Sequence, residues 1–492
     1  MNLRTITRRE ALAALPGAAL AATFGGPAPY GALPSDRQLL WHELELSGFL
    51  HFTVNTFTGR EWGYGDEDPN IFHPTAFDAE AIVENLHAGG MRAVILTCKH
   101  HDGFCLWPTR TTSHSVKASK WREGTGDVVR DVAEAARRRG MRFGVYVSPW
   151  DRNAASYGGP AYVEMYRAQL RELLTDYGPI GEVWHDGANG GDGYYGGARE
   201  KRQIDKKTYY DWPRTWDLIR SLQPDAAIFS DVGPDIRWVG NERGIANETC
   251  WATYDPVSPT GGPASPGDVN AKLSPEGTRH GSRWLPAECD VSIRPGWFWH
   301  PEESSRVKTA QQLLDLYYQS VGRGASLLLN VPPDRRGLPD PADAASLEEF
   351  GALLRRTFRV DLAAGSKVTA SNVRGKSRTF RAENMVEGAG SRYWTTDDDV
   401  TTAEAVLEWK RPVTFNVVRL RENIRSGQRV EQFKVDVWQN GDWREVGGGT
   451  SIGACRLLRL SGDATSNRVR LRIVQSPAPP AISEFALHLA PA

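Results

Sequence analysis

Between residues 38 and 358, short apolar runs alternate with amphipathic stretches of helical periodicity. Runs such as GFLHFTV (48–54) and RFGVYVSPW (142–150) are each followed by one of these stretches. This alternation predicts parallel strands with helices on both faces, because parallel strands need crossover connections. About seven strands in a span of this length favour a (β/α)8-like TIM barrel over an open doubly wound sheet. The absence of a glycine-rich dinucleotide fingerprint after the first strand also disfavours an open sheet.

Several predicted strands end in polar side chains. In barrels of this kind, active-site groups lie at the C-terminal ends of the strands. A single strand-end aspartate is as often a turn residue or a helix cap as a catalyst. Four strands that bring such residues to one rim nevertheless predict a functional site there. The residues are His51, His100, His101, Tyr146, Trp184 and Asp186.

The residue types at this rim favour glycoside hydrolysis. No carboxylate or cysteine lies at metal-ligand spacing from the histidines, and no G-x-S-x-G elbow is present for a serine nucleophile. Glycosidases use one carboxylate as nucleophile and one carboxylic acid as proton donor, and Asp186 is the candidate nucleophile. The 17 tryptophans suit stacking on sugar rings as well as core packing. We expect neither a redox cofactor nor a catalytic metal.

From about residue 40 to 490 the chain resembles the α-L-fucosidases of glycoside hydrolase family 29. The matching motifs, in order, are HF in the first strand, Glu61-Trp62, KHHDGFCLWPT (99–109), YVSPW (146–150) and EVWHDG (182–187). The resemblance implies that Asp186 forms the covalent glycosyl-enzyme intermediate. His185 differs from the residue of many family members, so it receives no role. The resemblance also implies a fucose pocket lined by His51, Glu61, Trp62, His100, His101, Tyr146 and Trp184.

The proton donor is less easily placed. The stretch DIRWVGNERG (235–244) resembles the subgroup that cleaves branched α-1,3 and α-1,4 fucosyl linkages. In that subgroup the glutamate of the GNE motif is the general acid/base, which implies Glu242. Trp238 nearby would partly desolvate this glutamate and raise its pKa. The alternative is a solvated Glu242 paired with Arg243. Other candidate acids are Asp231, Asp235, Glu248 and Glu288.

Three further features belong to the same rim. Arg237 and Trp297 (in RPGWFWH) are additional candidates to line the pocket. The insert NGGDGYYGGAREKRQIDKK (189–207) is rich in glycine and charge, which predicts a long rim loop. Its two tyrosines either contact sugars beyond fucose or belong to a solvated loop without a role.

The N-terminal segment predicts export. Residues 1–33 contain the pair Arg8-Arg9, an alanine-rich apolar run and small residues, which is the layout of a twin-arginine signal peptide. Pro16 and Gly17 interrupt the run, so we expect no membrane anchor. The expected location is the periplasm or the medium. Lys+Arg 59 against Asp+Glu 60 gives no sign of a nucleic-acid partner.

Residues 360–492 change to alternating apolar and polar positions with turns such as Asn440-Gly441. This pattern predicts an antiparallel β-sandwich. The segment resembles discoidin-like (galactose-binding-like) domains, some of which bind carbohydrate beside a structural calcium ion. We favour a domain that braces the barrel over one that binds sugar independently.

These observations together predict an exported, retaining exo-α-L-fucosidase that removes α-1,3/1,4-linked fucose from branched glycans. Its partners would be fucosylated oligosaccharides or glycoconjugates. Two alternatives remain: a non-catalytic fucose-binding protein, and a related glycosidase for another 6-deoxy or galacto-configured sugar.

Overall fold

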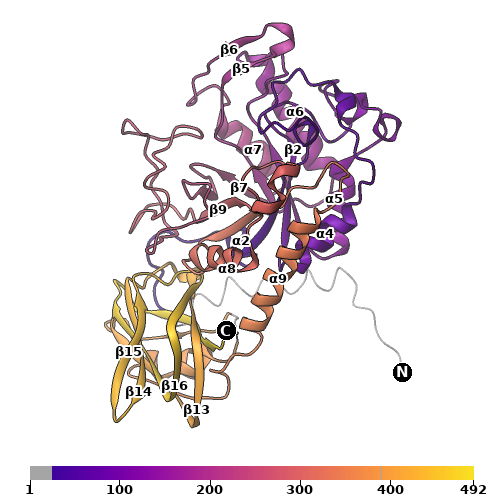
Figure 1. The fold of residues 1–492 in the computed structure, drawn as a ribbon. Helices are drawn as coiled ribbons and strands as arrows, with labels where there is room; N and C mark the ends of the chain where they lie inside the picture. The colour runs from indigo at the N-terminus through magenta and orange to yellow at the C-terminus, as the bar shows by residue number, and fades with distance from the viewer. Residues whose placement is uncertain (1–24, 389–390, 492) are drawn as a thin grey trace, which may run out of the picture.

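The computed structural model describes residues 25–388 and 391–491 of the chain (Figure 1). The arginine pair and the apolar run of the predicted signal peptide lie outside the described residues. Among the helices that are described, none is long and apolar enough to cross a membrane.

Eight parallel strands close into a barrel in the order β1-β10-β9-β8-β7-β4-β3-β2. The predicted TIM-barrel class is therefore confirmed. Strands β4 and β8 each have three residues, and sequence periodicity does not reveal β8, which follows β7 closely. The barrel strands are β1 (Leu46–Leu50), β2 (Ala93–Lys99), β3 (Arg142–Val147), β4 (Glu182–Trp184), β7 (Ala227–Ser230), β8 (Ile236–Trp238), β9 (Ala287–Ser292) and β10 (Ser326–Asn330).

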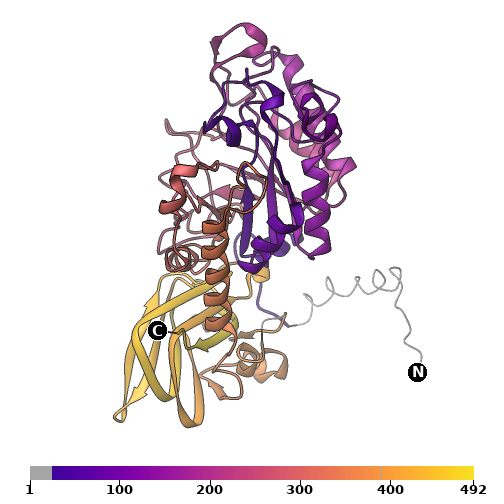
Figure 2. The ribbon, with the colours of Figure 1, turned by 45° about the vertical axis from the view of Figure 1, so that its right-hand side comes forward.

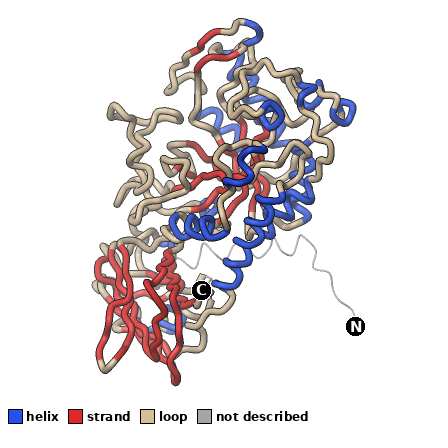
Figure 3. The backbone as a smooth tube through the Cα atoms, in the orientation of Figure 1, coloured by secondary structure: helices blue, strands red, loops and turns tan. Residues whose placement is uncertain are grey.

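The helices cover the barrel incompletely. Residues 231–235 join β7 to β8 without a helix, and the long segment 239–286 between β8 and β9 is also free of helices. Elsewhere each connection carries a helix that packs on the outer face of the strands (Figure 3). The helices are α2 (Asp36–His42), α3 (Val54–Thr58), α4 (Ala79–Ala88), α5 (Val128–Arg138), α6 (Pro160–Asp176), α7 (Trp212–Leu222), α8 (Ala310–Gln319) and α9 (Pro341–Phe358).

Aspartates fix the start of several of these helices. The side chains of Asp78, Asp127 and Asp340 accept hydrogen bonds from backbone N–H groups in the first turns of α4, α5 and α9. These bonds satisfy donors that a helix N-terminus otherwise leaves free. The three aspartates are therefore explained by local structure rather than by catalysis.

Aromatic rings and acids fill the barrel interior. Trp184 stacks on Phe229 with ring centroids 4.1 Å apart. Below it lie Glu182 and Glu288, which are buried and accept hydrogen bonds from the indole N–H groups of Trp41 and Trp184 at 3.2 and 3.0 Å. The floor beneath the C-terminal rim is thus made of indoles tied to carboxyl groups.

The C-terminal part is an antiparallel β-sheet domain, as predicted. Its seven strands follow the order β12-β17-β13-β16-β14-β15, and β11 pairs with β13. Alternate positions of β13 and β14 point into a separate hydrophobic core that contains Leu407, Phe415 and Phe433. The strands are β11 (Lys367–Ala370), β12 (Trp394–Thr395), β13 (Ala403–Glu422), β14 (Gln432–Gln439), β15 (Asp442–Gly449), β16 (Arg456–Gln475) and β17 (Ala481–His488).

This domain packs against the segment that follows β8 and against helices α8 and α9. Gln428 accepts a hydrogen bond from the Ala252 N–H at 2.8 Å, and Arg456 donates to the Glu248 carbonyl at 2.6 Å. Leu457 belongs to the main core of the barrel, not to the core of its own domain. In Figures 1 and 2 the domain lies at the end of the molecule opposite the hairpin of β5 (Gly191–Gly193) and β6 (Glu200–Arg202).

Candidate active site

A cavity of about 320 Å³ opens at the C-terminal ends of the barrel strands. Its walls come from the strand ends themselves and from the loops that follow β8 and β9. Of the eleven residues proposed for the site from the sequence, nine line this cavity. They are His51, Trp62, His100, His101, Tyr146, Trp184, Asp186, Glu242 and Trp297.

Asp186 follows β4 and turns into the cavity. Its Oδ2 accepts a hydrogen bond from the Tyr146 hydroxyl at 3.0 Å, and its Oδ1 accepts one from the Ala188 N–H at 2.7 Å. Burial, and secondly the charge of Asp186, raise the pKa of Tyr146, so the phenol stays a donor. The neighbouring His185 is fully buried and bonds to the Tyr166 hydroxyl at 2.8 Å, outside the cavity. Both oxygens of the Asp186 carboxylate are thus held in a fixed orientation.

His101 presents an acceptor nitrogen beside this carboxylate. Its Nδ1 lies 2.6 Å from Ser148 Oγ, which itself donates to the Trp150 carbonyl at 2.7 Å. Ser148 has one proton to give, so the proton between the two residues belongs to His101 Nδ1. Burial lowers the pKa of His101, and the neutral ring then carries a lone pair on Nε2, 3.8 Å from Asp186 Oδ2. A sugar hydroxyl can donate into the space between these two acceptors.

His51 is held in the same tautomer by Asn330. The Asn330 amide nitrogen donates to Ser292 Oγ and to the Trp297 carbonyl, both at 2.8 Å. Its Oδ1 therefore accepts from His51 Nδ1 at 2.9 Å. Burial lowers the pKa of His51 to about 3, which leaves Nε2 as another neutral acceptor. His100 is likewise kept neutral, because burial lowers its pKa well below the usual value.

Glu242 lies at the mouth of the cavity, in the segment after β8. Its Oε2 accepts a hydrogen bond from Trp297 Nε1 at 3.3 Å. Although part of its surface reaches solvent, burial against the cavity wall raises its pKa, and the charges of Asp186 and Glu61 add to this effect. No ion pair joins Glu242 to Arg243 in the described part of the chain, so the geometry agrees with a partly desolvated acid.

The other candidate acids differ in whether they reach the cavity. Asp231 lines the cavity, and burial raises its pKa to about 6 although the Gly267 N–H donates to it at 2.8 Å. Asp235 forms ion pairs with arginines outside the barrel, and Glu248 forms ion pairs at the domain interface. Glu288 lies below the cavity floor. Asp231 is thus the one alternative to Glu242 among these candidates that reaches the cavity.

Two proposed pocket residues do not line the cavity. Arg237 is fully buried on the outer face of β8, where it donates to the carbonyls of Ser274 and Trp251, each at 3.0 Å. Strand alternation is the reason, because its neighbours Ile236 and Trp238 occupy the inward positions. Arg237 therefore anchors the β8–β9 segment.

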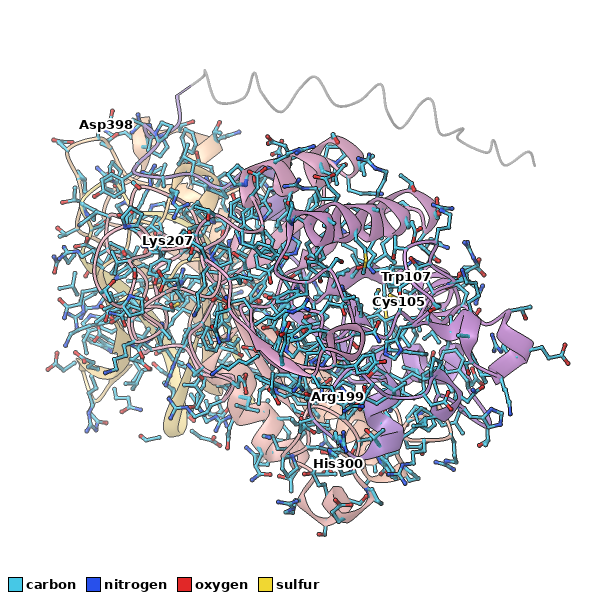
Figure 4. All side chains as sticks on the ribbon, turned by 90° about the horizontal axis from the view of Figure 1, so that it is seen from above. Cys105, Trp107, Arg199, Lys207, His300 and Asp398 are labelled. Carbon is cyan, nitrogen blue, oxygen red and sulfur yellow. The ribbon has the colours of Figure 1, made fainter. Side chains whose placement is uncertain are left out.

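Glu61 is the second of these residues, and it contacts the backbone of the cavity residue Trp297 rather than the cavity itself. Its Oε2 accepts from the Trp297 N–H, and its Oε1 bonds to His300 Nε2, both at 2.7 Å. Figure 4 labels His300 among the barrel side chains, far from Asp398 on the C-terminal domain. Glu61 therefore holds the loop that carries Trp297 rather than facing the cavity.

The rim loop 189–207 supports the site from behind. Tyr195 is 1% exposed, and its hydroxyl accepts from Trp150 Nε1 and donates to the Gly191 carbonyl, both at 2.9 Å. Trp150 in turn contacts Trp62 and His101 at the cavity wall. Tyr195 is thus a structural brace and cannot reach a sugar beyond fucose.

Sequence reasoning missed four cavity residues that occupy inward positions on strands. One is Asp290, whose Oδ1 accepts from Trp238 Nε1 at 2.7 Å. The available signal was the two-residue period of ECD (288–290), which places Asp290 on the same face as Glu288 and closer to the rim. The four residues are Phe49, Phe229, Trp238 and Asp290.

The rim cavity of this TIM barrel combines carboxyl groups, indoles and neutral imidazoles. These are the side chains that a glycoside hydrolase uses. The family model described as Alpha-L-fucosidase matches residues 34–357. The chain belongs to this family, the α-L-fucosidases of glycoside hydrolase family 29. It is an α-L-fucosidase, and its substrates contain fucose.

Relatives of known name agree over nearly the whole chain. "Alpha-L-fucosidase 1" of Arabidopsis thaliana is 44% identical over 468 residues, which are 94% of this chain and 88% of that protein. The crystal structure of SpGH29 is 36% identical with a TM-score of 0.85, and the match covers 95% of this chain and 100% of that one. A Ruminococcus gnavus GH29 fucosidase, solved in complex with fucose, is 32% identical with a TM-score of 0.84, covering 95% and 97%.

Proposed function

We propose that this fucosidase is an exo-acting, retaining enzyme with Asp186 as nucleophile and Glu242 as general acid/base. The observation that carries the proposal is that both carboxyl groups line one cavity in different surroundings. Tyr146 and the Ala188 N–H orient the Asp186 carboxylate for attack. Burial raises the pKa of Glu242, as a proton donor near neutral pH requires.

The reaction follows from these two positions. Asp186 attacks the anomeric carbon of an α-fucoside while the bond to the leaving oxygen breaks and Glu242 protonates that oxygen. This step gives a β-linked fucosyl ester. Glu242, now ionised, removes a proton from a water molecule, which attacks the same carbon and releases Asp186. Two inversions return fucose in the α configuration.

The neutral imidazoles orient the sugar during both steps. His51 and His101 each present an unprotonated Nε2 to the cavity, so each accepts a hydrogen bond from a hydroxyl group of fucose. Because neither ring is charged, neither competes with Glu242 for the role of acid. These contacts explain selection of a neutral sugar.

Rescue by azide tests the roles of Asp186 as nucleophile and Glu242 as general acid/base. Glu242→Ala should damage hydrolysis of natural glycans severely. It should spare the first step with activated aryl fucosides, whose leaving groups depart without a proton, so that the fucosyl ester accumulates. Azide needs no general base, so it should rescue this variant and give α-fucosyl azide with retained configuration. Asp186→Asn should lose turnover by several orders of magnitude and remain folded. If Glu242→Ala loses activity equally on natural glycans and aryl fucosides, or if azide gives no α-fucosyl azide, the acid role would pass to Asp231. The variant Asp231→Asn is the matched comparison.

The proposed linkage preference is for α-1,3- and α-1,4-linked fucose on branched glycans. Its support is the resemblance of residues 235–244 to the subgroup with this preference, together with the place of Glu242 at the cavity mouth. Purified enzyme should hydrolyse fucosylated trisaccharides with these branches at least tenfold faster than α-1,2- or α-1,6-linked fucosides. Comparable kcat/KM values for all linkages would refute the preference.

Export by the twin-arginine route is part of the proposal. It rests on the Arg8-Arg9 pair and the apolar run after it. Replacing both arginines by lysine should keep active enzyme inside the producing cells, as measured by cell fractionation.

A further inference from the structure

Hydrogen-bond donors are scarce on the cavity wall. The Tyr146 hydroxyl donates to Asp186, and the indole N–H groups of Trp184, Trp238 and Trp297 donate to Glu288, Asp290 and Glu242. His51 and His101 offer acceptors, as derived above. A sugar hydroxyl also has lone pairs that need donors, and a buried acceptor without a donor costs free energy. A further donor on the wall would therefore favour the binding of a sugar hydroxyl.

Asp290 has the position for this role. It lies at the inward end of β9, is 4% exposed and lines the cavity. Trp238 Nε1 occupies its Oδ1 at 2.7 Å, whereas no protein group in the described residues donates to its Oδ2. The other side chains of the wall that can donate are Trp62, which is 52% exposed at the mouth, one nitrogen of His100, and the carboxylic acids Asp231 and Glu242.

Burial and the neighbouring carboxyl groups both favour the neutral form of Asp290. The titratable groups that face it are two more carboxyl groups, Glu242 and Glu288, while its neighbour on β10 is Leu328. Asp290 takes part in no ion pair in the described portion of the chain. Burial, and secondly the charge of Glu242, raise its pKa well above the usual value. A neutral carboxylic acid has an O–H group, and here that group belongs to Oδ2.

We propose that Asp290 is a substrate-binding residue that donates a hydrogen bond from its neutral carboxylic acid to one ring hydroxyl of fucose, at C2, C3 or C4. The inference rests on the proposed function only in that fucose occupies this cavity. It requires no role for Asp186 or Glu242 in turnover. Asp290 contributes a donor to the cavity in which His51 and His101 contribute acceptors.

Calorimetry with L-fucose and its 2-, 3- and 4-deoxy analogues tests the proposal on the full-length enzyme. Asp290→Leu removes the donor and should weaken L-fucose binding at least tenfold. Asp290→Asn keeps an N–H donor of similar size and should restore most of that loss. For the one analogue that lacks the bonded hydroxyl, wild type and Asp290→Leu should differ less than twofold. The proposal would be overturned if Asp290→Leu weakened the binding of all three analogues equally or left the binding of L-fucose unchanged. It would also be overturned if Asp290→Asn bound L-fucose as weakly as Asp290→Leu.

A pH series decides the question if Asp290→Leu fails to fold. Ionisation of Asp290 removes its proton, so the affinity of the wild type for L-fucose should fall as the pH rises through the raised pKa of this group. Asp290→Asn has no such proton to lose and should show a flatter profile. Because the two proteins differ at one position, other titrating groups cancel in the comparison. Identical slopes would refute the proposal. Since only binding is measured, a separate failure of the azide experiment would concern Asp186 and Glu242 alone.

Discussion

Trp297 tunes the proposed acid at the scale of a single residue. Its indole N–H donates to Glu242 and so favours the ionised carboxylate, which lowers the pKa that burial otherwise raises. Trp297→Phe should remove this stabilisation and raise the pKa of Glu242 further. The enzyme is active while the acid is protonated, so the alkaline limb of kcat/KM should move to higher pH. Activity should also fall severalfold, as for loss of about 1 kcal/mol.

The matched control for this experiment is Trp299→Phe. Trp299 lies in the same loop, but its N–H donates to Asp340 at 2.9 Å, and it does not line the cavity. This control should leave the alkaline limb in place. If the alkaline limb of kcat/KM does not move in Trp297→Phe, a group other than Glu242 controls it.

Individual site residues were predictable where a motif placed them directly after a strand. His51, His101 and Asp186 are such residues, and all three line the cavity. Arg237 was misplaced because its inward or outward direction depends on the register of a strand too short to recognise. Glu61 faces a loop that comes 236 residues later in the chain, and local patterns do not report such a contact.

At the scale of the elements, β4 and β9 meet through an acid pair. Glu182 and Glu288 are buried and have pKa values raised first of all by burial. A raised pKa contributes stability that is fully present below the ordinary glutamate range and is lost as the pH rises through the folded value. The barrel should therefore lose stability toward alkaline pH.

Glu288→Gln tests this pH dependence. The amide keeps an acceptor for Trp184 Nε1 but cannot ionise, so the fall in Tm between about pH 5 and pH 8 should become smaller. Glu348→Gln, the same change on the exposed face of α9, should retain the slope of the wild type. Melting curves by circular dichroism give the comparison. Parallel slopes in all three proteins would show that the acid pair is not the cause.

Element prediction succeeded for strands that lie in an apolar run of their own. Seven of the eight barrel strands follow from such runs, whereas β8 is separated from β7 by only residues 231–235 and no helical stretch lies between them. Such a strand exists because Phe229 and Ser230 pair with Ile236 and Arg237. Pairing of this kind is a tertiary contact, and no periodicity within three residues encodes it.

At the scale of the whole molecule, two adjacent leucines distinguish the two cores. Leu457 packs into the barrel core and Leu458 into the core of the C-terminal domain. Leu457→Ala should cost about 2–4 kcal/mol of unfolding free energy. It should also speed hydrogen exchange around Gly322, because the Leu457 N–H bonds to the Gly322 carbonyl at 2.9 Å.

Leu458→Ala is the internal control for that effect. It should destabilise the molecule while leaving exchange in the barrel unchanged. If both variants affect the barrel equally, the domain does not brace it through Leu457. The antiparallel class of this domain was predictable from alternation, but its docking surface depends on single side chains such as Leu457 that the alternation does not distinguish.

The helix-free segment between β8 and β9 has a consequence for inheritance. In a regular barrel each strand brings its own covering helix, so one strand–helix unit can be exchanged as a self-contained module. Here the cover for the segment that carries Glu242 is supplied by the C-terminal domain. Glu248 and Arg456, which join the two parts, stand 208 positions apart. A recombination event that replaced the distal half of the gene would therefore also remove the contacts that hold the segment after Glu242.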